Sequence, residues 1–430
     1  MTLHVETPVK TAGSPGPETA ELHKDTHAGL LRHPSTAGRD RTPVDAIIVP
    51  AARQATALQA VFAVAKVLHT VLVVICSHAA RAADAVAEAK KFDVDVIAID
   101  NPSRSLLPRF RTTHALAGTR FEPSATRSDA IPDTSAKRNI GLLLARMAGW
   151  ERIVFVDDDI AIDAEAVREA VCLLGDEWHA VGLGNHGYPD NSVVCHAYRY
   201  AGGKQGAFIG AGALAVAVSK VEAFFPDVYN EDWLFLYDAV AERKVAIVGE
   251  MAQHTYDPFA DRRRAMQEEF GDCLGEGLFW LLHDQEGDRR DAADHAFWTD
   301  FLAKRRRFIA EIRRRLATQD AGPKTEKMLV SLEAADNCHK VINPRRMVDF
   351  ITDWKRDRQT WQQFVTDTVD GQEWAIDKAL AQLDLEYERS EPAAVLAPVP
   401  ATIPAVAGRG GWFRSWFTRK ARHPSAPMAT

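Results

Sequence analysis

The chain has 430 residues and a formal net charge of -7 at pH 7, with 46% hydrophobic and 26% charged residues. This balance is typical of a soluble globular protein that forms one large domain with appendages, or two domains. The negative net charge argues against general nucleic-acid binding. The N-terminus has no basic segment followed by an apolar one, and the most apolar region, 55–76, is interrupted by polar residues. We therefore expect a cytoplasmic protein without a signal peptide or membrane span.

The cysteines are scattered, odd in number and without CxxC spacing. Such a distribution indicates neither a disulfide framework nor a zinc site, and it fits a reducing cytoplasm. The five residues are Cys76, Cys172, Cys195, Cys273 and Cys338.

The first 43 residues mix Pro, Gly, Thr, His and charged residues without periodic apolar spacing. A segment of this composition cannot bury enough surface to offset the entropy lost on ordering. The sequence therefore predicts that residues 1–43 are disordered.

Short apolar runs then alternate with segments of helical periodicity. Runs rich in Val and Ile predict strands, and apolar residues spaced by three or four predict helices. The predicted strands are 45–53, 70–77 and 95–100, and the predicted helices between them are 55–68 and 79–92. Alternation of this kind predicts an α/β fold with a mainly parallel sheet covered on both faces.

A helix over 135–150 leads into the apolar run 153–156, which three consecutive carboxylates end: Asp157, Asp158 and Asp159. Acids at the end of a buried strand repel one another and lose hydration unless a cation neutralises them. Mg²⁺ and Mn²⁺ are hard ions that take such oxygen ligands. The triplet therefore predicts a divalent metal site.

Further along, residues 206–220 combine glycines with small apolar residues, and NEDW begins a helix with Glu231 and Asp232. Glycines in such a stretch let the backbone approach a ligand or another strand closely. A strand over 244–250 then leads into a loop that holds His254.

Long, charged helical segments follow the α/β region, and a Pro- and Ala-rich tail ends the chain. We therefore expect an α/β domain over 44–290, a helical extension over 291–388, and a flexible tail over 389–430.

The strand–helix alternation, the strand ending in DDD, the Gly-rich stretch and the later NEDW together resemble the GT-A fold nucleotide-sugar glycosyltransferases, close to their large family 2 group. Residues 136–160, AKRNIGLLLARMAGWERIVFVDDDI, resemble the segment that carries the DxD motif of that family. The resemblance covers roughly residues 44–261, a little over half of the chain. It implies a Rossmann-like mixed sheet flanked by helices. It also implies metal-dependent transfer of a sugar from a UDP- or GDP-linked donor to an acceptor hydroxyl.

The resemblance implies particular roles for the acids. Asp159, with or without Asp157, would bind Mn²⁺ or Mg²⁺, and His254 would be a third metal ligand. Asp157 or Asp158 would contact the ribose. The metal would stabilise the charge that develops on the diphosphate leaving group.

In inverting members of this family, the Asp that matches Asp232 takes the proton from the acceptor hydroxyl. Glu231 would hold the acceptor or serve as the base itself. In a retaining enzyme, Asp232 would only position the acceptor. The remaining residues implied in nucleotide-sugar binding are Pro50, Ala51, Arg53, Asp100, Lys137, Arg138, Gly210 and Gly212.

Two alternatives stay open. A nucleotidyltransferase can share this kind of sheet and also uses paired acids with Mg²⁺, but its first loop is usually Gly-rich, whereas PAARQATAL here has no glycine. The other alternative is a GT-A-like binding protein without catalysis. The acceptor itself cannot be predicted from the sequence.

The tail carries a separate pattern of aromatic and basic residues. Trp412, Phe413, Trp416 and Phe417 are interleaved with basic residues that end at Arg422. As a helix, this segment would place an aromatic face beside cations, which suits peripheral contact with an anionic membrane. Docking to a partner or to the rest of the chain is the alternative.

Overall fold

The strand β1 (Ala46–Ala51) lies inside the sheet, and its successive side chains enter two different hydrophobic cores. Ile47 and Val49 belong to one core, and Ala46 and Ile48 belong to the other. Successive side chains of a strand point to opposite faces of the sheet, so an all-apolar strand is stable only where both faces are covered. All six residues of β1 are buried, as the sequence predicts.

The computed structural model describes residues 21–36, 42–100, 106–117, 133–185, 192–206, 209–284, 292–319 and 322–392. The predicted disorder of residues 1–20 and 37–41 lies outside the described residues. So does the aromatic and basic segment of the tail.

The sheet has nine strands in the order β5-β8-β6-β7-β4-β1-β2-β3-β9. The pairs β1–β2, β1–β4, β2–β3 and β6–β8 are parallel, and the other four neighbouring pairs in the described chain are antiparallel. The bounds after β1 are β2 Val71–Cys76, β3 Val96–Asp100, β4 Arg152–Val156, β5 Ile160–Ala161, β6 Ala180–Asn185, β7 Ala213–Ala217, β8 Val245–Gln253 and β9 Tyr387–Ser390. The α/β fold with a mixed sheet is confirmed, but the sheet is less parallel than the alternation suggests.

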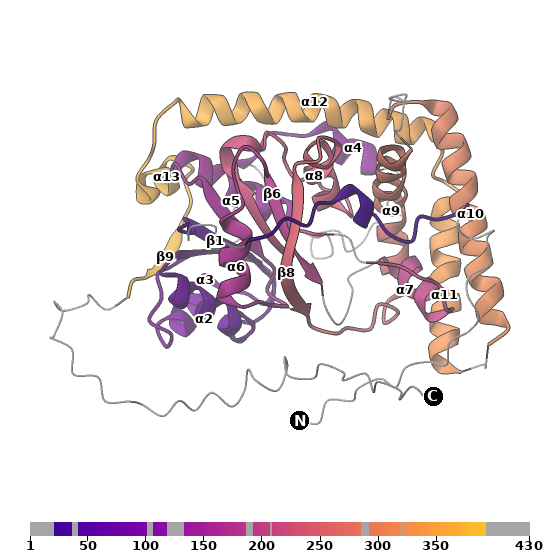
Figure 1. Cartoon of the computed structure of the whole chain (residues 1–430), viewed down its shortest axis with the longest axis horizontal. Helices are drawn as coiled ribbons and strands as arrows, with labels where there is room; N and C mark the ends of the chain where they lie inside the picture. The colour runs from indigo at the N-terminus through magenta and orange to yellow at the C-terminus, as the bar shows by residue number, and fades with distance from the viewer. Residues whose placement is uncertain are drawn as a thin grey trace, which may run out of the picture. The chain divides into compact units, whose positions relative to one another are not determined.

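Helices cover both faces of this sheet (Figure 1). One core includes α2, α3 and α6, whereas the other includes α5, α8, α9, α10 and α12. A third core lies among α7, α10 and α11. The bounds are α2 Gln59–Leu68, α3 Ala82–Ala89, α4 Arg111–Ala117, α5 Thr134–Met147, α6 Ala164–Val171, α7 Val193–Tyr200, α8 Glu231–Ala241, α9 Arg262–His283, α10 His295–Ala317, α11 Pro323–His339, α12 Pro344–Val369 and α13 Ile376–Gln382. None of the described helices combines the length and apolarity needed to cross a membrane.

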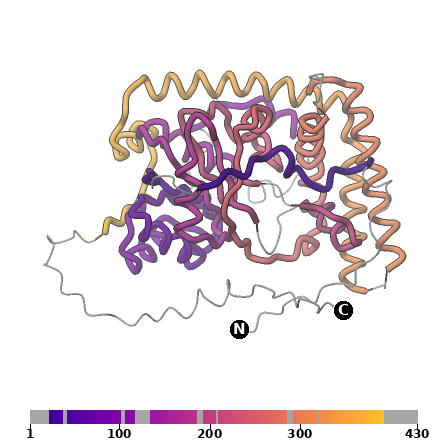
Figure 2. Tube along the Cα trace, viewed as in Figure 1, coloured from indigo at the N-terminus to yellow at the C-terminus, as the bar shows by residue number. Residues whose placement is uncertain are grey.

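Residues 21–36 are packed against the domain, which corrects the prediction of disorder as far as residue 43. Figure 2 traces this indigo segment across the domain, and it includes the short 3-10 helix η1 (Ala28–Leu30). His23, His27 and Leu30 are buried. The segment is also tied to β8, because the Arg32 N–H donates to the Val245 carbonyl at 3.2 Å. Composition averaged over 43 residues hides these few side chains, which find partners far away in the sequence.

The C-terminal helices and the sheet belong to one compact unit that ends at Pro392. α11 packs on α9, and α12 packs on α4 and α5. β9 then adds an antiparallel strand beside β3, so Arg389 and Ser390 are part of the sheet rather than the start of a flexible tail. Arg389 is held there by ion pairs with Asp95 and Asp377, both at 3.3 Å. The predicted boundary at 389 is therefore too early.

Candidate functional site

The predicted site residues gather at the edge of the sheet where the parallel strands β1 and β4 end. In open α/β sheets, ligands bind beyond the carboxyl ends of such strands. β7 runs antiparallel to β4 and begins beside its end, with Ala213 opposite Val156. The Asp157 N–H accordingly donates to the Gly212 carbonyl at 2.9 Å. The acid triplet and the glycine segment therefore lie side by side.

Arg138 of α5 links two acidic segments that are far apart in the sequence. Its Nη2 donates to both carboxylate oxygens of Asp157 at 2.7 and 2.9 Å, and its Nη1 donates to Glu231 Oε1 at 2.5 Å. The Arg138 side chain is only 3% exposed. A guanidinium offers several N–H donors in one plane, so it can serve two carboxylates at once. One buried cation thus ties the end of β4 to the first residue of α8.

The RNIG sequence around Arg138 holds α5 against the sheet. Asn139 clamps the backbone of Phe225, since its Nδ2 donates to the carbonyl at 2.7 Å and its Oδ1 accepts from the N–H at 2.8 Å. Gly141 packs on Ile48 of β1, where an added Cβ would lie 2.5 Å from the side chain. The motif therefore serves close packing of α5 on β1 as well as charge neutralisation.

The environment moves the pKa values of the two linked carboxyls by different amounts. Burial raises the pKa of Asp157 to about 6, although Arg138 pulls in the other direction. Burial also raises the pKa of Glu231 to about 8, again against Arg138 and with a contribution from the nearby Asp232. Burial alone would lower the pKa of Arg138, but Asp157 and Glu231 raise it above its usual value. Near pH 7, Asp157 is therefore mostly ionised while Glu231 mostly keeps its proton.

Asp158 shapes the loop after β1. Its Oδ2 accepts from the backbone N–H groups of Ala52 and Arg53 at 2.7 and 2.8 Å, and its Oδ1 accepts from the Arg53 guanidinium. The Asp158 side chain is 5% exposed. These hydrogen bonds give Asp158 a structural role in positioning the loop, and its contact with the ribose stays a prediction.

Asp159 and His254 are brought together by backbone pairing. β5 pairs with β8 so that Ile160 lies opposite Gln253, and the His254 N–H donates to the Asp159 carbonyl at 3.0 Å. His254 is exposed, whereas the Asp159 side chain is 12% exposed and accepts from Arg53 Nη2 at 3.0 Å. The predicted neighbourhood of these two residues is present.

The predicted metal ligands Asp157, Asp159 and His254 do not converge as a set. Among the described residues, they are absent from the groups of three whose ligand atoms all lie within 4.8 Å of one another. Asp157 is committed to Arg138 through both oxygens. The carboxylate of Asp159 and the imidazole of His254 are donor groups that bind divalent ions. In this structure, Arg53 forms an ion pair with Asp159. Arg53 is 52% exposed, so it can turn away without unpacking the core.

Asp232 anchors the glycine segment to the start of α8. Its Oδ2 accepts from the Ala211 N–H and its Oδ1 accepts from the Trp233 N–H, both at 2.9 Å. Gly210 lies so close that an added Cβ would be 2.7 Å from Asp232 Oδ2. Each oxygen of an ionised carboxylate has a further lone pair for a hydroxyl. Asp232 is therefore a rigidly held acceptor at this edge.

Two basic residues predicted to bind the nucleotide sugar, Lys137 and Arg138, already have partners within the chain. Lys137 is buried, and its Nζ donates to the Ala51 carbonyl at 2.8 Å and pairs with Asp133 at 2.9 Å. Arg138 is buried between Asp157 and Glu231, as described above. These cations therefore neutralise the protein's own groups in this structure, and their contact with a nucleotide sugar stays a prediction.

Other predicted nucleotide contacts have mixed positions. Pro50 and Ala51 are buried in β1 rather than displayed on a loop, so only Ala52 and Arg53 lie beyond the strand. Asp100 is exposed at the end of β3, and its Oδ1 accepts from the Ala82 N–H at 2.8 Å at the start of α3. This hydrogen bond caps the first turn of α3, which is a sufficient structural reason for an acid at this position.

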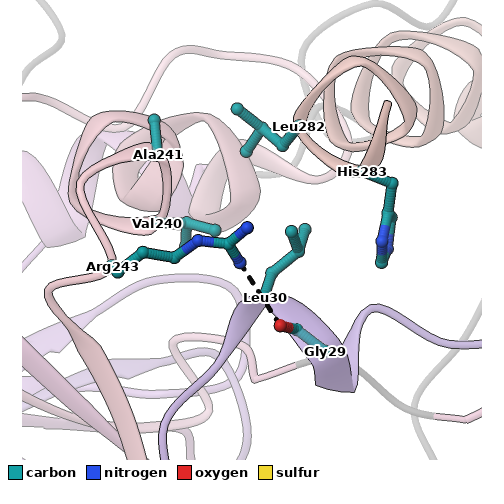
Figure 3. Close-up of a pocket in the computed structure, with 7 residues that line it drawn as sticks. All are labelled: Gly29, Leu30, Val240, Ala241, Arg243, Leu282 and His283. Atoms are coloured by element: carbon teal, nitrogen blue, oxygen red, sulfur yellow. Dashed lines mark hydrogen bonds between the residues drawn. The ribbon is translucent and has the colours of Figure 1, made fainter. Parts of the chain in front are cut away.

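A cavity of about 370 Å³ lies elsewhere, between η1 and the C-terminal ends of α8 and α9 (Figure 3). Its rim includes a hydrogen bond of 3.3 Å from Arg243 Nη1 to the Gly29 carbonyl. Arg243 follows α8, whose other end carries Asp232, and a helix rises about 1.5 Å per residue. The cavity is therefore separate from the acid cluster.

A second group of buried charges, which the sequence did not lead us to predict, lies along α9. Glu269 and Asp272 both pair with Arg305 of α10, which is itself buried although it lies within the basic run 304–307. Glu268 and Glu276 are buried on the same helix. The spacing of these acids at three or four residues was the available signal, because it places them on one side of a helix.

No protein-family model matches the chain, and no curated protein matches it in sequence.

Proposed function

We propose that this chain is a GT-A type glycosyltransferase that moves a sugar from a UDP- or GDP-linked donor to an acceptor hydroxyl. The observation that supports it most strongly is the bridge from Arg138 to both Asp157 and Glu231. This bridge makes the strand-end triplet and the acid pair of α8 parts of one site. A metal-dependent transferase needs both groups together, one near the leaving diphosphate and one near the acceptor.

The donor diphosphate would lie beyond the ends of β1 and β4. Asp159 and His254 would hold Mn²⁺ or Mg²⁺, which supplies Lewis-acid stabilisation of the diphosphate charge. Arg53 would leave Asp159 and turn toward the phosphates, to which a guanidinium binds well. Asp158 keeps the loop at Ala52 and Arg53 in place during this exchange because it binds the backbone of both residues.

The acceptor would bind at the start of α8. Asp232 accepts the proton of the acceptor hydroxyl, since both of its oxygens are oriented by backbone N–H groups and each retains a free lone pair. Glu231 mostly keeps its proton near pH 7, because burial raises its pKa to about 8. It therefore serves better as a hydrogen-bond donor to the acceptor than as the base.

The test is a panel of nucleotide sugars with Mn²⁺ or Mg²⁺, scored for slow hydrolysis of the donor. We expect one donor class to be hydrolysed, and we expect Asp159→Ala and His254→Ala to lower the rate at least about 10-fold, because ligand shells tune affinity by 10–100-fold. Glu165→Ala is the matched control, since this acid is exposed on α6 nearby. An unchanged rate in Asp159→Ala, or no turnover of any donor, would sink the proposal.

A second candidate is a nucleotide-binding protein of this fold without catalysis. The observation that favours it is that Asp157, Asp158 and Asp159 all have arginine partners within the chain. Binding of UDP or GDP with Mn²⁺, without hydrolysis of any donor, would select this candidate. A nucleotidyltransferase gains no such support.

A further inference from the structure

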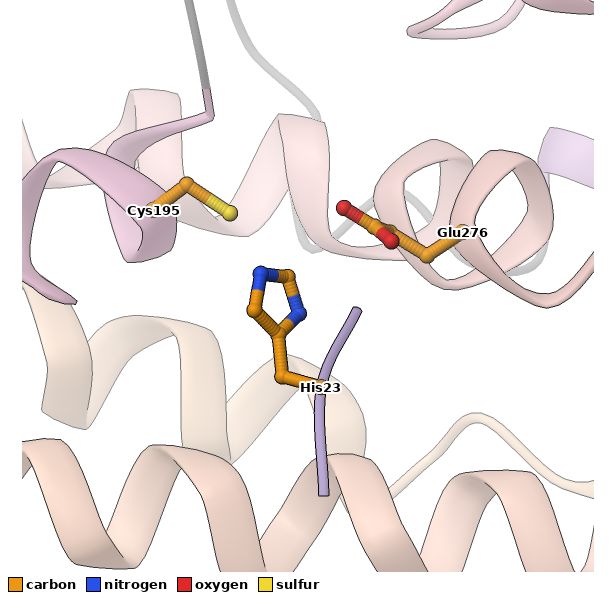
Figure 4. A group of neighbouring side chains, drawn as sticks. All are labelled: His23, Cys195 and Glu276. Atoms are coloured by element: carbon orange, nitrogen blue, oxygen red, sulfur yellow. The ribbon is translucent and has the colours of Figure 1, made fainter. Parts of the chain in front are cut away.

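Three side chains from distant parts of the chain meet inside the protein, away from the acid cluster. His23 comes from the N-terminal segment, Cys195 from α7 and Glu276 from α9, and Figure 4 shows them pointing toward one shared space. One potential ligand atom of each lies within 4.8 Å of the others, and all three residues are buried. Zinc bonds of about 2.0–2.3 Å place tetrahedral ligands roughly 3.2–3.8 Å apart, so small side-chain movements suffice to close this set around an ion.

The Glu276 carboxyl forms its ion pair with a histidine, not with a lysine or arginine, among the described residues. Within the described chain, its ion-pair partner within 4.0 Å is His27, whose Nε2 lies 3.3 Å from Oε2. An imidazole carries a charge only when it is protonated, so His27 is not a permanent cation beside this carboxyl. A buried carboxyl without a cation is costly in its ionised form. A bound metal ion would supply the missing charge.

A neighbouring cluster of the same three residue types already has ion-pair and hydrogen-bond partners within the chain. Glu269, Cys273 and His339 also converge within 4.8 Å, but Arg305 donates to both oxygens of Glu269 at 3.1 and 2.9 Å. His339 Nε2 lies 3.0 Å from the Leu302 carbonyl, which fits a donated N–H. This cluster already contains its cation, and the arginine would repel a metal ion. The two clusters can therefore be told apart by experiment.

We propose that His23, Cys195 and Glu276 bind a zinc ion. Thiolate, imidazole and carboxylate are the donor types of protein zinc sites, whereas hard ions such as Mg²⁺ do not favour a thiolate. Gln205 hydrogen-bonds to His23 Nε2, and its side-chain oxygen or a water completes the four ligands. No CxxC spacing announces this site, because each ligand comes from a different segment.

The zinc ion would link the N-terminal segment to α7 and α9. His27 packs edge-on against Trp233 with ring centroids 5.1 Å apart, and Trp233 directly follows Asp232. Cys195 would bind zinc as a thiolate, so the thiol must lose its proton. Binding therefore releases a proton and weakens as the pH falls.

The experiment uses the purified full chain with zinc or cobalt as the only probe. The chain is stripped with a chelator, reloaded, dialysed and assayed for metal content. We expect one tightly bound zinc per chain. We also expect a near-ultraviolet thiolate-to-cobalt band with Co²⁺, and a lower unfolding midpoint after stripping. The cobalt band excludes binding at Asp159 and His254, since that site contains no cysteine.

Variants then assign the ligands. His23→Ala and Cys195→Ser should lose the bound zinc and the cobalt band, whereas Cys273→Ser, the matched buried thiol of the neighbouring cluster, should keep both. If Cys195→Ser fails to fold, the proposal is still tested by the cobalt band, which should be present both in the unmodified chain and in Cys273→Ser. Absence of stoichiometric zinc in the unmodified chain, or loss of the band in Cys273→Ser alone, would overturn the proposal.

Discussion

The Arg138 guanidinium and the Glu231 carboxyl are joined by a 2.5 Å hydrogen bond between residues 93 positions apart. The same guanidinium binds Asp157, and all three groups lie where α5, α8 and β4 meet. This contact makes the charge balance of the candidate site depend on one buried arginine.

Replacing Arg138 with Met should therefore destabilise the fold strongly. Removing one partner of a buried ion pair leaves an uncompensated charge and costs about 3–5 kcal/mol. We expect a loss of that size in the free energy of unfolding near neutral pH, measured by urea denaturation. The deficit should shrink as the pH falls, because protonation of Asp157 removes the uncompensated charge, and loss of Arg138 raises the pKa of Asp157 further.

Arg263→Met is the control for this experiment, because Arg263 is exposed and forms a surface ion pair with Asp261 at 2.9 Å. It should change the unfolding free energy by less than about 1 kcal/mol, as exposed ion pairs do. Equal effects of the two substitutions would refute the role of Arg138.

Glu231 should make the stability depend on pH. Its pKa in the folded protein, about 8, lies above the ordinary carboxyl value. The stabilisation is therefore complete below the ordinary carboxyl pKa and is lost as the pH rises through about 8. Glu231→Gln resembles the protonated acid and should remain stable where the unmodified protein weakens. Urea unfolding across the range from the ordinary carboxyl pKa, 4.5, to about pH 8 checks this, and parallel pH profiles for the two proteins would contradict it.

Local patterns were sufficient to predict β1, β2, β3, β4 and β8 and the position of the acid triplet, but not β5, β6, β7 or β9. The apolar run that ends at Val156 and the glycines before β7 are features of neighbouring residues, and they lie together because parallel strands end at one edge of a sheet. The direction of β7 and β9 is set by tertiary packing, so alternation alone overestimated the parallel character of the sheet.

Partners of charged side chains could not be predicted in the same way. Lys137 and Arg138 begin a helix and look like surface cations in the sequence, yet both are buried. His23 lies in a segment whose average composition favours disorder, and Arg305 lies in a basic run. Each is buried because it meets an acid or a polar partner from another segment, and only the folded chain brings those partners together.

Removing Arg53 should strengthen metal binding while weakening nucleotide binding. Arg53 pairs with Asp158 and Asp159, so its guanidinium competes with a cation for Asp159. We expect Arg53→Met to bind Mn²⁺ several-fold more tightly, measured by the free Mn²⁺ signal in electron paramagnetic resonance. The same variant should bind UDP or GDP more weakly, because one phosphate-binding group is lost. Weaker Mn²⁺ binding in Arg53→Met would show that Arg53 orders Asp159 instead of blocking it.

Gly210→Ala should impair catalysis more than stability. A Cβ at this position would lie 2.7 Å from Asp232 Oδ2, so the carboxylate must move away from the N–H groups that orient it. Small displacements of a catalytic group cost about 10²-fold in rate. We expect a fall of that order in kcat for sugar transfer, or for donor hydrolysis if the acceptor is unknown. The unfolding midpoint should change little, since the atom that must yield is the end of a side chain.

The matched substitution for this test is Gly175→Ala, where an added Cβ meets nothing within 4 Å. It should leave kcat unchanged, which separates a local effect on Asp232 from a general effect of replacing glycine. Asp232→Asn provides the second comparison, because it keeps the shape of the side chain and removes its basicity. If Gly210→Ala retains full activity while Asp232→Asn loses it, the base does not depend on the glycine segment for its orientation. If both variants retain activity, proton transfer must be assigned to another group, and Glu231 is then the remaining acid at the start of α8.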